Sequence, residues 1–172
     1  SCDSDVIYRI SIRLAKDANG VEEFFLMEGR GACGYDKQLK QGDKDRQGIA
    51  IWLVDHTNLL RHPNGTDVIR YNTITAPGDG AWPGIHGIVS LLPADGKFDM
   101  EHNDNRGDEF DLFRKDFGAP HVAYRINNLG IKLNGGKTKT YPNTKSIAAG
   151  KEQWSGIYIE VLDDIKYSMR VK

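Results

Sequence analysis

Apolar and polar residues alternate along much of the chain, and this alternation predicts β-strands rather than helices. Between Val6 and Leu14, every second side chain from Tyr8 onward is apolar, whereas the residues between them are arginine or serine. Asn19-Gly20 follows as a signal for a tight hairpin turn, since both residue types accept a positive φ angle. Another largely apolar segment, Glu23–Met27, comes next. The chain is therefore predicted to open with a β-hairpin.

The other predicted strands combine apolar or alternating residues with Gly, Pro, Asn or Asp near their ends. They are Ile49–Val54, Val68–Ile74, Ile85–Leu92, Val122–Ile126, Ile131–Leu133, Ile157–Val161 and Ile165–Val171. The first of these is apolar throughout, which is typical of a strand buried on both faces. The segment Lys97–Glu101 follows a turn at 93–96, and we expect it to pair antiparallel with Ile85–Leu92.

One segment has the spacing of a helix instead. Phe110, Phe113 and Phe117 recur at intervals of three and four residues, and a Gly-Ala-Pro sequence follows them as a typical helix end. We therefore predict one short helix over 108–116.

The remaining pattern concerns the organisation of the whole chain. Residues 135–151 are polar and basic with few strand signals, and we predict a long polar loop there. No internal repeat divides the chain, and its length suits one well-cored domain. The sequence therefore predicts a single, mainly β domain over residues 1–172, folded as a β-sandwich or jelly-roll-like barrel with the short helix near 108–116.

The composition is that of an ordinary globular protein and narrows the classes of function. Of the 172 residues, 39% are hydrophobic and 27% charged, and 23 Lys and Arg against 24 Asp and Glu give a formal net charge of -1. A general nucleic-acid binder usually carries an excess of positive charge, so no nucleic-acid partner is expected. No apolar stretch reaches the roughly 18–20 residues of a transmembrane helix, so no transmembrane segment is expected.

Two cysteines, Cys2 and Cys33, admit three interpretations. They can form a disulfide in an oxidising compartment; Cys2 can carry a lipid anchor, since Ser1-Cys2-Asp3 is similar to a processed lipoprotein junction; or both can be free thiols. The absence of Met at position 1 favours a processed chain. We therefore expect an exported protein in the extracellular space or the cell envelope, periplasmic or surface-exposed.

Acidic and amide side chains are concentrated between residues 99 and 111. Oxygen-bearing side chains recur there at short intervals, as in calcium-binding loops, where hard oxygen ligands surround a hard cation. The candidate calcium ligands are Asp99, Glu101, Asn103 and Asp104. The alternative is a solvated acidic loop whose charges favour the N-terminus of the predicted helix.

A second candidate site combines histidines with the same carboxylates. His86 has glycines on both sides at the end of a predicted strand, where a ligand can approach the backbone closely. The hairpin expected from Ile85–Leu92 and Lys97–Glu101 places Glu101 and His102 near His86, and such a group can perform acid-base catalysis. If the protein is an enzyme, His86, Glu101 and His102 are the candidate catalytic residues. The alternative for His86 is a partly buried imidazole bonded to a backbone carbonyl.

Two tryptophans, Trp82 and Trp154, lie among glycine, proline and polar residues. An indole exposed in such surroundings can stack on the apolar face of a sugar ring. These tryptophans, with Arg106 from the acidic segment, are the candidate residues for ligand binding. Packing in or at the edge of the core is the alternative for each tryptophan.

Short motifs spread over residues 5–126 resemble the catalytic domain of L,D-transpeptidases. In order, they are the turn at Asn19-Gly20, Gly34-Tyr35-Asp36-Lys37, Gly42-Asp43, Gly48-Ile49-Ala50-Ile51, Ile85-His86-Gly87, Glu101 through Arg106, and Gly118-Ala119-Pro120-His121-Val122. The resemblance implies a β-rich fold related to enzymes that cross-link peptidoglycan through a cysteine nucleophile. His102 and Arg106 match the family's Ser-His-Gly-Cys-x-Arg motif, but Asp104 occupies the nucleophile position. A carboxylate cannot replace that thiolate, so the resemblance implies a degenerate member that binds, inhibits or catalyses another reaction.

Three functions follow from these patterns, and we favour a protein that is not an enzyme. The first is an exported β-rich module that binds a glycan or cell-envelope polymer, with calcium as a candidate cofactor. The second is a hydrolase or transferase acting on a cell-wall or polysaccharide substrate with a histidine-carboxylate acid-base site. The third is a structural or assembly subunit that self-associates through its strand edges and loops.

Overall fold

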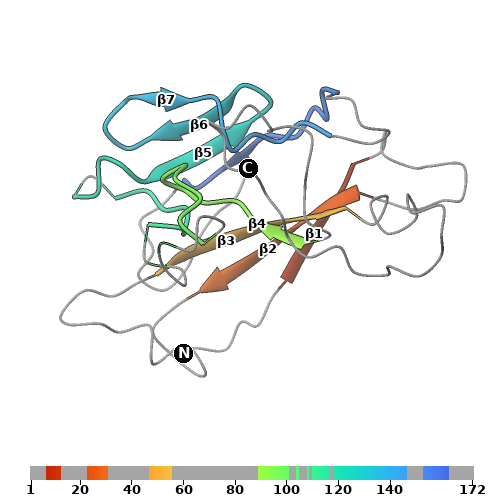
Figure 1. The fold of residues 1–172 in the computed structure, drawn as a ribbon, viewed down its shortest axis with the longest axis horizontal. Coiled ribbons are helices and arrows are strands. Elements are labelled where there is room, and N and C mark those ends of the chain that lie inside the picture. Colours follow the sequence, from red (N-terminus) through yellow and green to blue (C-terminus); the bar gives the residue numbers. More distant parts are fainter. Residues whose placement is uncertain are drawn as a thin grey trace, which may run out of the picture.

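Two antiparallel sheets make up the computed structural model, which describes residues 7–12, 23–30, 47–55, 89–100, 104, 108, 110–116, 118–146 and 153–162. The first sheet has the strand order β1-β2-β3-β4, with β1 at Ile7–Ser11, β2 at Glu23–Arg30, β3 at Gly48–Asp55 and β4 at Val89–Leu91. The second has the order β7-β6-β5-β8, with β5 at Ala123–Asn127, β6 at Gly130–Leu133, β7 at Thr138–Lys139 and β8 at Ile159–Glu160. Figure 1 shows β5, β6 and β7 lying together beside the longer strands of the first sheet.

The strands confirm the predicted mainly β class. β1 and β2 form the predicted opening hairpin, and β5 and β6 form a second antiparallel hairpin. β3, β4 and β8 fall within, or one residue beyond, segments predicted as strands. The predicted strands at Val68–Ile74 and Ile165–Val171 lie outside the described residues.

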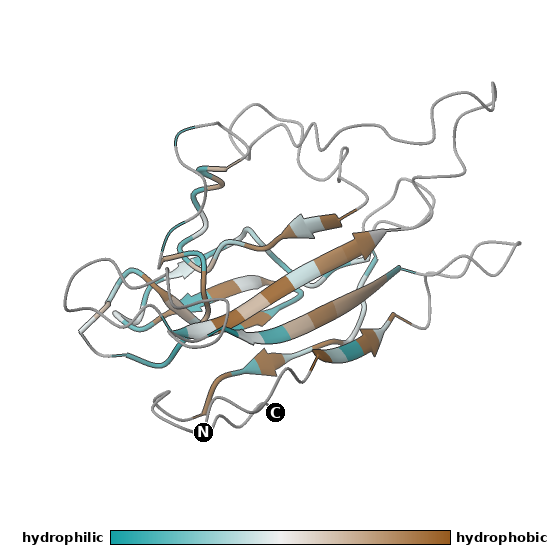
Figure 2. Ribbon diagram, turned by 90° about the horizontal axis from the view of Figure 1, so that it is seen from below, coloured by the Kyte–Doolittle hydropathy of each residue, from teal (hydrophilic) through white to brown (hydrophobic). Residues whose placement is uncertain are grey.

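One hydrophobic core joins the two sheets. Its members from the first sheet include Phe25, Ile51 and Leu53, and those from the second include the isoleucines of β5, β6 and β8. The bands of apolar and polar colour that alternate along the strands in Figure 2 reflect the period of two that places every second side chain in this core. The arrangement is the one expected of a β-sandwich.

The strand β3 is buried on both faces, as its unbroken apolar sequence predicts. On one face, Ile49 and Ile51 belong to the core between the sheets. On the other, Ala50 packs with Leu91 and Leu112, and half-buried Trp52 lies against them. The first sheet therefore needs a cover on its outer face, which the chain around Leu112 provides.

That chain segment corrects the prediction of a helix over 108–116: none of the described residues in this range is helical. Phe113 instead pairs with Ile49, its N–H donating to the Ile49 carbonyl at 2.9 Å and its carbonyl accepting from the Ile49 N–H at 2.8 Å. The Asp108 carboxylate accepts from the Phe110 N–H, and the Asp111 carboxylate from the Asp108 N–H, each at 2.7 Å. These bonds compete with a helical ladder, and pairing with β3 adds a tertiary contact that a helix cannot make.

The expected hairpin between Ile85–Leu92 and Lys97–Glu101 is also corrected. β4 pairs with β3 alone among the described strands, and residues 94–100 form turns. Phe98 has a φ of 60° and is buried against Tyr141, so the backbone here leaves the extended conformation. Burial of this phenylalanine outweighs the strand pattern, and the geometric reason for placing Glu101 and His102 beside His86 is removed.

The predicted loop 135–151 contains more structure than its sequence indicates. It includes β7, and Ser146 pairs with Gln153 outside the named strands. Thr144 is fully buried, with its N–H donating to the Asn127 carbonyl at 3.0 Å and its hydroxyl to the Ile157 carbonyl at 2.8 Å. In this segment, hydrogen bonds made by polar residues, rather than further strand pairing, stabilise the second sheet.

Candidate functional site

The outward-facing side of the second sheet carries a row of polar side chains. Because the isoleucines of β5, β6 and β8 face the core, the residues next to them face the opposite way. The strand register places Thr138 opposite Lys132, Lys132 opposite Arg125, and Arg125 opposite Glu160. These four residues, here called the outer row, run across all four strands.

Three exposed apolar side chains belong to the turn between β5 and β6 and to the segment that leads into β8. Trp154 is 64% exposed, Tyr158 37% and Leu129 69%. These three residues are here called the aromatic patch. The Asn128 side-chain oxygen accepts from the Ser155 N–H at 2.9 Å and from the Ser155 hydroxyl at 3.2 Å, and these bonds hold the segment before β8 against the turn between β5 and β6.

Tyr158 links the aromatic patch to the outer row. The Arg125 guanidinium carbon lies 5.8 Å from the centre of the Tyr158 ring, within the range of a cation–π contact. The Tyr158 hydroxyl donates a hydrogen bond to the Glu160 carboxylate. This bond, together with desolvation, raises the pKa of Tyr158, so the phenol stays protonated near neutral pH. The face therefore presents an aromatic ring between a fixed cation and a fixed carboxylate.

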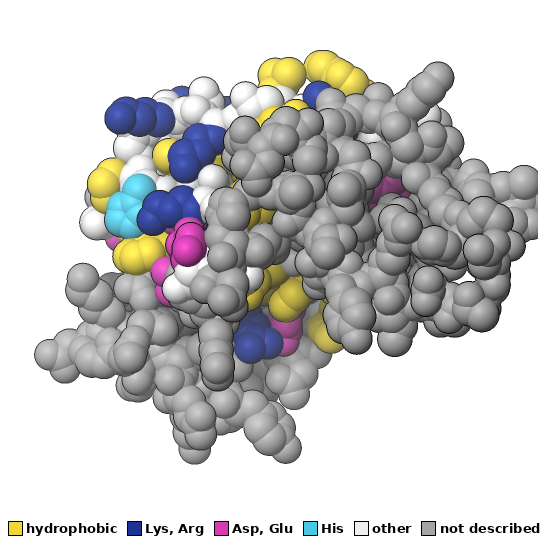
Figure 3. Space-filling model, in the orientation of Figure 1, with side chains coloured by type: hydrophobic (Ala, Val, Ile, Leu, Met, Phe, Trp, Pro, Cys, Tyr) yellow, Lys and Arg dark blue, Asp and Glu magenta, His cyan; other side chains and the backbone are white. Residues whose placement is uncertain are grey.

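Positive charge is concentrated on this half of the described structure. In residues 118–146 and 153–162, the single acidic residue is Glu160, against the cationic residues Arg125, Lys132, Lys137, Lys139 and Lys145. Figure 3 shows Lys and Arg side chains gathered over the region where β5, β6 and β7 lie in Figure 1. Among the described residues, this half therefore carries five Lys and Arg side chains against one acidic side chain.

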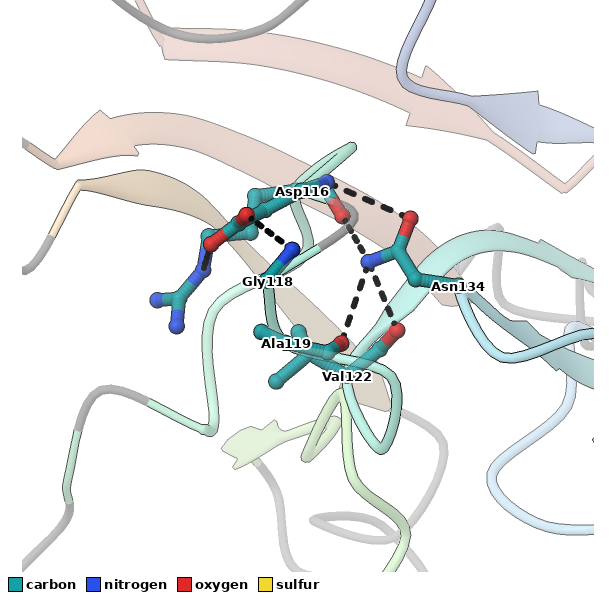
Figure 4. Close-up of polar contacts among 6 residues, drawn as sticks. Asp116, Gly118, Ala119, Val122 and Asn134 are labelled. Carbon is teal, nitrogen blue, oxygen red and sulfur yellow. Dashed lines mark hydrogen bonds and ion pairs between the residues drawn. The ribbon is translucent and has the colours of Figure 1, made fainter.

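The Asn134 side chain, at the end of β6, forms hydrogen bonds with the backbone of the turns that lead into β5 (Figure 4). This group of hydrogen bonds is here called the clamp. The Asn134 side-chain nitrogen donates to the carbonyls of Arg114 at 2.9 Å and Val122 at 3.0 Å, and lies 3.5 Å from that of Ala119. Its side-chain oxygen accepts from the Asp116 N–H at 3.2 Å. One side chain therefore satisfies the backbone of the turns that lead into β5.

Burial shifts the pKa of two carboxylates, one within the acidic segment and one just before it. Burial raises the pKa of Asp111 to about 6, and the charges of Asp108, Asp95 and Asp99 add to this effect. Burial also raises the pKa of Asp95, although the hydrogen bonds and charge of Lys97 act against the shift. The Lys97 ammonium lies 3.2 Å from the Asp95 carboxylate. Carboxyl groups whose pKa is raised by burial occur at acid-base sites and in buried turns alike.

The predicted calcium ligands are brought together only in part. The Asp104 N–H donates to the Asp99 carbonyl at 2.8 Å, so these two residues close a turn. Glu101 and Asn103 lie outside the described residues. Within the ranges that the structure describes, no group of three or more His, Cys, Asp or Glu side chains is arranged to hold a metal ion. The calcium site stays a prediction.

Most of the other predicted site residues lie outside the residues that the structure describes. They are the candidate catalytic residues His86, Glu101 and His102, the candidate ligand contacts Trp82 and Arg106, and both cysteines, Cys2 and Cys33. Trp154 is the exception, and it is exposed, as ligand binding through its ring requires.

The sequence patterns did not indicate Arg125, Tyr158 or Glu160 as residues of a functional site. A signal for two of them is present, because Ile157, Ile159 and Val161 alternate with Tyr158 and Glu160 and so assign those two to the face away from the core. Their meeting with Arg125 depends on the pairing of β5 with β8, which joins segments about 35 residues apart and leaves no local signal.

Comparison with protein-family models, with curated proteins and with solved structures finds no match to this chain. In the ranges that the structure describes, no helix has the length and apolar character needed to cross a membrane.

Proposed function

We propose that this protein is an exported β-rich module that binds a glycan or cell-envelope polymer on the outward face of its second sheet. The aromatic patch would supply the surface for stacking against sugar rings. The outer row would supply donors and acceptors for the sugar hydroxyl groups. Export is proposed because Cys2 and Cys33 can form a disulfide, which persists in an oxidising compartment.

The exposure of Trp154 carries the proposal. Tryptophan is highly buried in most folded proteins, so an indole that is 64% exposed, four residues before the exposed Tyr158, is unusual. Exposed apolar surface with a polar rim is typical of binding sites. The ring offers a flat apolar face to the C–H groups of a sugar, and Trp and Tyr supply such contact area at a small cost in side-chain entropy.

The polar neighbours favour a sugar over a purely apolar ligand. Arg125 offers several donors in a fixed plane, whereas Glu160 offers acceptors and Thr138 offers both. Direct hydrogen bonds from such groups fix the orientation of a ligand whose rings stack on aromatic side chains. Because the described cations of this half outnumber its acidic residues, polymers with carboxylate or phosphate groups should bind more tightly, and added salt should weaken them.

Binding without catalysis suits the same geometry. Most glycosidases use two carboxyl groups that flank the scissile bond. Glu160 is the only carboxylate of the outer row, and the Tyr158 hydroxyl already donates to it. The face can hold a polymer, but its described residues do not supply an acid-base pair.

The test compares Trp154→Ala and Tyr158→Ala with Tyr8→Ala. Tyr8 is 59% exposed on β1, in the first sheet, so its removal is matched in chemistry and exposure but not in position. Sedimentation with insoluble peptidoglycan, chitin and an acidic polysaccharide measures the bound fraction. We expect Trp154→Ala to weaken binding about tenfold, as the loss of about 1.4 kcal/mol would do. Equal binding by all variants, or no binding by the parent protein, would overturn the proposal.

Calcium assistance is a separate part of the proposal. Asp99 and Asp104 already close one turn, and Glu101 and Asn103 follow Asp99 closely along the chain. A calorimetric titration with calcium, repeated on Asp99→Asn and Asp104→Asn, should show heat of binding in the parent chain alone. An unchanged titration in both variants would remove calcium from the proposal without affecting the aromatic patch.

A second candidate function is an acid-base enzyme acting on the same polymers. It is favoured by the Asp111 carboxyl group, whose pKa of about 6 is suited to proton transfer near neutral pH. Its predicted partners are His86, Glu101 and His102. Release of soluble fragments from peptidoglycan or polysaccharide, measured by chromatography, would support it if His86→Ala and Glu101→Gln abolish release. Failure of the parent protein to release any fragment excludes this function for those substrates.

A further inference from the structure

The residue at the centre of the clamp is followed by glycine. Asn134 makes hydrogen bonds to backbone groups of Arg114, Asp116 and Val122, with the Ala119 carbonyl at the longer distance of 3.5 Å. Figure 4 shows its side chain pointing toward this turn region from the end of β6. The amide nitrogen and the amide oxygen are therefore both held in the folded state.

The fold also requires the glycine. The Gly135 N–H donates to the Pro120 carbonyl at 2.8 Å. A Cβ added at position 135 would lie 2.9 Å from that carbonyl oxygen, closer than real Cβ contacts. Both residues of this Asn-Gly pair are therefore required by the fold. The hydrogen bonds require an amide at position 134, and the close approach of Pro120 requires the absence of a side chain at position 135.

Asn-Gly is the sequence in which asparagine deamidates most readily, because glycine does not shield its own backbone nitrogen. We propose that Asn134 is a deamidation site that the folded state closes and unfolding opens, and whose product weakens the clamp. The Gly135 nitrogen loses its proton to base and attacks Cγ of Asn134. The bond from Cγ to the side-chain nitrogen breaks, ammonia leaves with a proton, and a succinimide forms. Water then opens that ring to aspartate or isoaspartate.

The folded geometry opposes the first step in two ways. The Gly135 N–H donates to the Pro120 carbonyl, so this bond must break before the nitrogen can lose its proton and attack. The Asn134 amide cannot rotate into line without breaking its bonds to Arg114, Asp116 and Val122. Reaction therefore requires the local opening of this turn region, and its rate scales with the population of the open state.

The product cannot rebuild the clamp. An aspartate at position 134 keeps an acceptor for the Asp116 N–H but has no N–H to donate to the carbonyls of Arg114 and Val122. Its second oxygen would face those carbonyl oxygens, so two attractive contacts would become repulsive next to a negative charge, although the backbone N–H of residue 134 would still donate to the Val122 carbonyl. An isoaspartate would also lengthen the backbone in the turn after β6. After deamidation, the turn region around position 134 is therefore less able to return to its folded conformation.

The first experiment follows the unmodified full-length chain. It is incubated in mildly alkaline buffer with and without denaturing urea, and the tryptic peptide Leu133–Lys137 is scored by mass spectrometry for conversion of amide to acid. The chain's other Asn-Gly pairs, Asn19-Gly20 and Asn64-Gly65, report the intrinsic rate in urea. We expect position 134 to react in urea as these pairs do, and at least about tenfold more slowly in the folded chain. Similar rates at position 134 in both conditions would overturn the proposal.

The second experiment tests the consequence with a matched control. Asn134→Asp imitates the product, and Asn127→Asp makes the same change of charge at the end of β5. The Asn127 side-chain oxygen accepts from the Leu129 N–H at 2.8 Å, and an aspartate keeps that bond. The urea midpoint of Asn134→Asp should fall clearly below that of Asn127→Asp. Equal midpoints would show that deamidation at this site does not weaken the fold.

Discussion

In the second sheet, the polar side chains of the outer row point away from the core, whereas the carboxylates of Asp95, just before the acidic segment, and of Asp111 within it are buried. Asp95 accepts from the Lys97 N–H at 3.0 Å, and Asp111 accepts from the Asp108 N–H at 2.7 Å. The acidic segment therefore uses its carboxylates in place of a backbone ladder. The sheet satisfies its backbone by strand pairing, and its polar side chains can be directed at a ligand.

The two regions differ in what their polar residues indicate about function. Acidic residues are more concentrated between 99 and 111 than anywhere on the second sheet, and they suggest a site by their number alone. Their described members are tied largely to their own turns. The outer row has fewer charges, but strand register aligns them beside the exposed Tyr158 ring, and this alignment is the stronger indication of a binding surface.

The largest expected effect breaks the sheet that carries the binding surface. Gly130, the first residue of β6, has a φ of 120°, and an added Cβ would lie 1.9 Å from the Lys139 carbonyl oxygen. Gly130→Ala should therefore separate β6 from β7 and lower the free energy of unfolding by about 3 kcal/mol or more. Urea denaturation measures the change, and polymer binding should be lost with it.

The matched control is Gly136→Ala, in the next turn of the same sheet. Gly136 has a φ of 84°, but an added Cβ there would meet nothing within 4 Å. Only the backbone strain remains, and it should cost about 1 kcal/mol. Equal losses for the two variants would show that the close approach of β6 and β7 does not support the second sheet.

A smaller effect, with the opposite sign, is expected in the acidic segment. The pKa of Asp111 is raised from 3.8 to about 6, so the folded state holds its proton more tightly than the unfolded state. Stability should therefore fall as the pH rises from about 4 to 6 and stay lowered above that range. Asp111→Asn removes the buried charge and keeps an acceptor for the Asp108 N–H, so it should stabilise the protein at pH 7 by up to about 3 kcal/mol.

Urea midpoints at pH 7 and pH 4 check both the sign and the pH window. The gain from Asp111→Asn should be largest at pH 7 and should disappear near pH 4, where aspartic acid is neutral in the folded state. Asp104→Asn is the control, because Asp104 is exposed, and it should change stability by less than about 0.5 kcal/mol at either pH. A loss of stability at pH 7 in Asp111→Asn would mean that the charged form is favoured in the folded state.

The same two regions show how far the sequence predicts the structure. The alternation of residues 122–126 and 131–133 predicts β5 and β6 to within one residue, because both strands lie between a core and a polar face. The spacing of Phe110 and Phe113 predicts a helix, yet Phe113 reaches the core by pairing with Ile49. Spacing alone does not distinguish a helix from a bonded turn whose aromatic residues face the core.

The sequence predicts less of the candidate site than of the strands, because the site also depends on tertiary pairing. Trp154 is recognisable because glycine and polar neighbours make a poor core segment. Arg125 is an unremarkable residue in an alternating strand, and it gains its place beside Tyr158 only when β5 and β8 pair. Contacts between segments distant in sequence determine this site, and such contacts cannot be derived from local patterns.

The smallest expected effect refines the binding surface rather than breaking it. Arg125 lies near the Tyr158 ring and opposite Glu160, so Arg125→Gln removes the cation and leaves a shorter side chain whose amide can still form hydrogen bonds. Binding of an acidic polysaccharide should weaken about fivefold, equivalent to about 1 kcal/mol, because a charge-assisted hydrogen bond becomes a neutral one. Arg30→Gln makes the same change on β2 and should leave binding unaltered, since Arg30 is paired with Glu28 at 3.1 Å. If the two variants bind alike across a range of salt concentrations, the charge of the outer row does not contact the polymer, and only the aromatic patch remains as the binding surface.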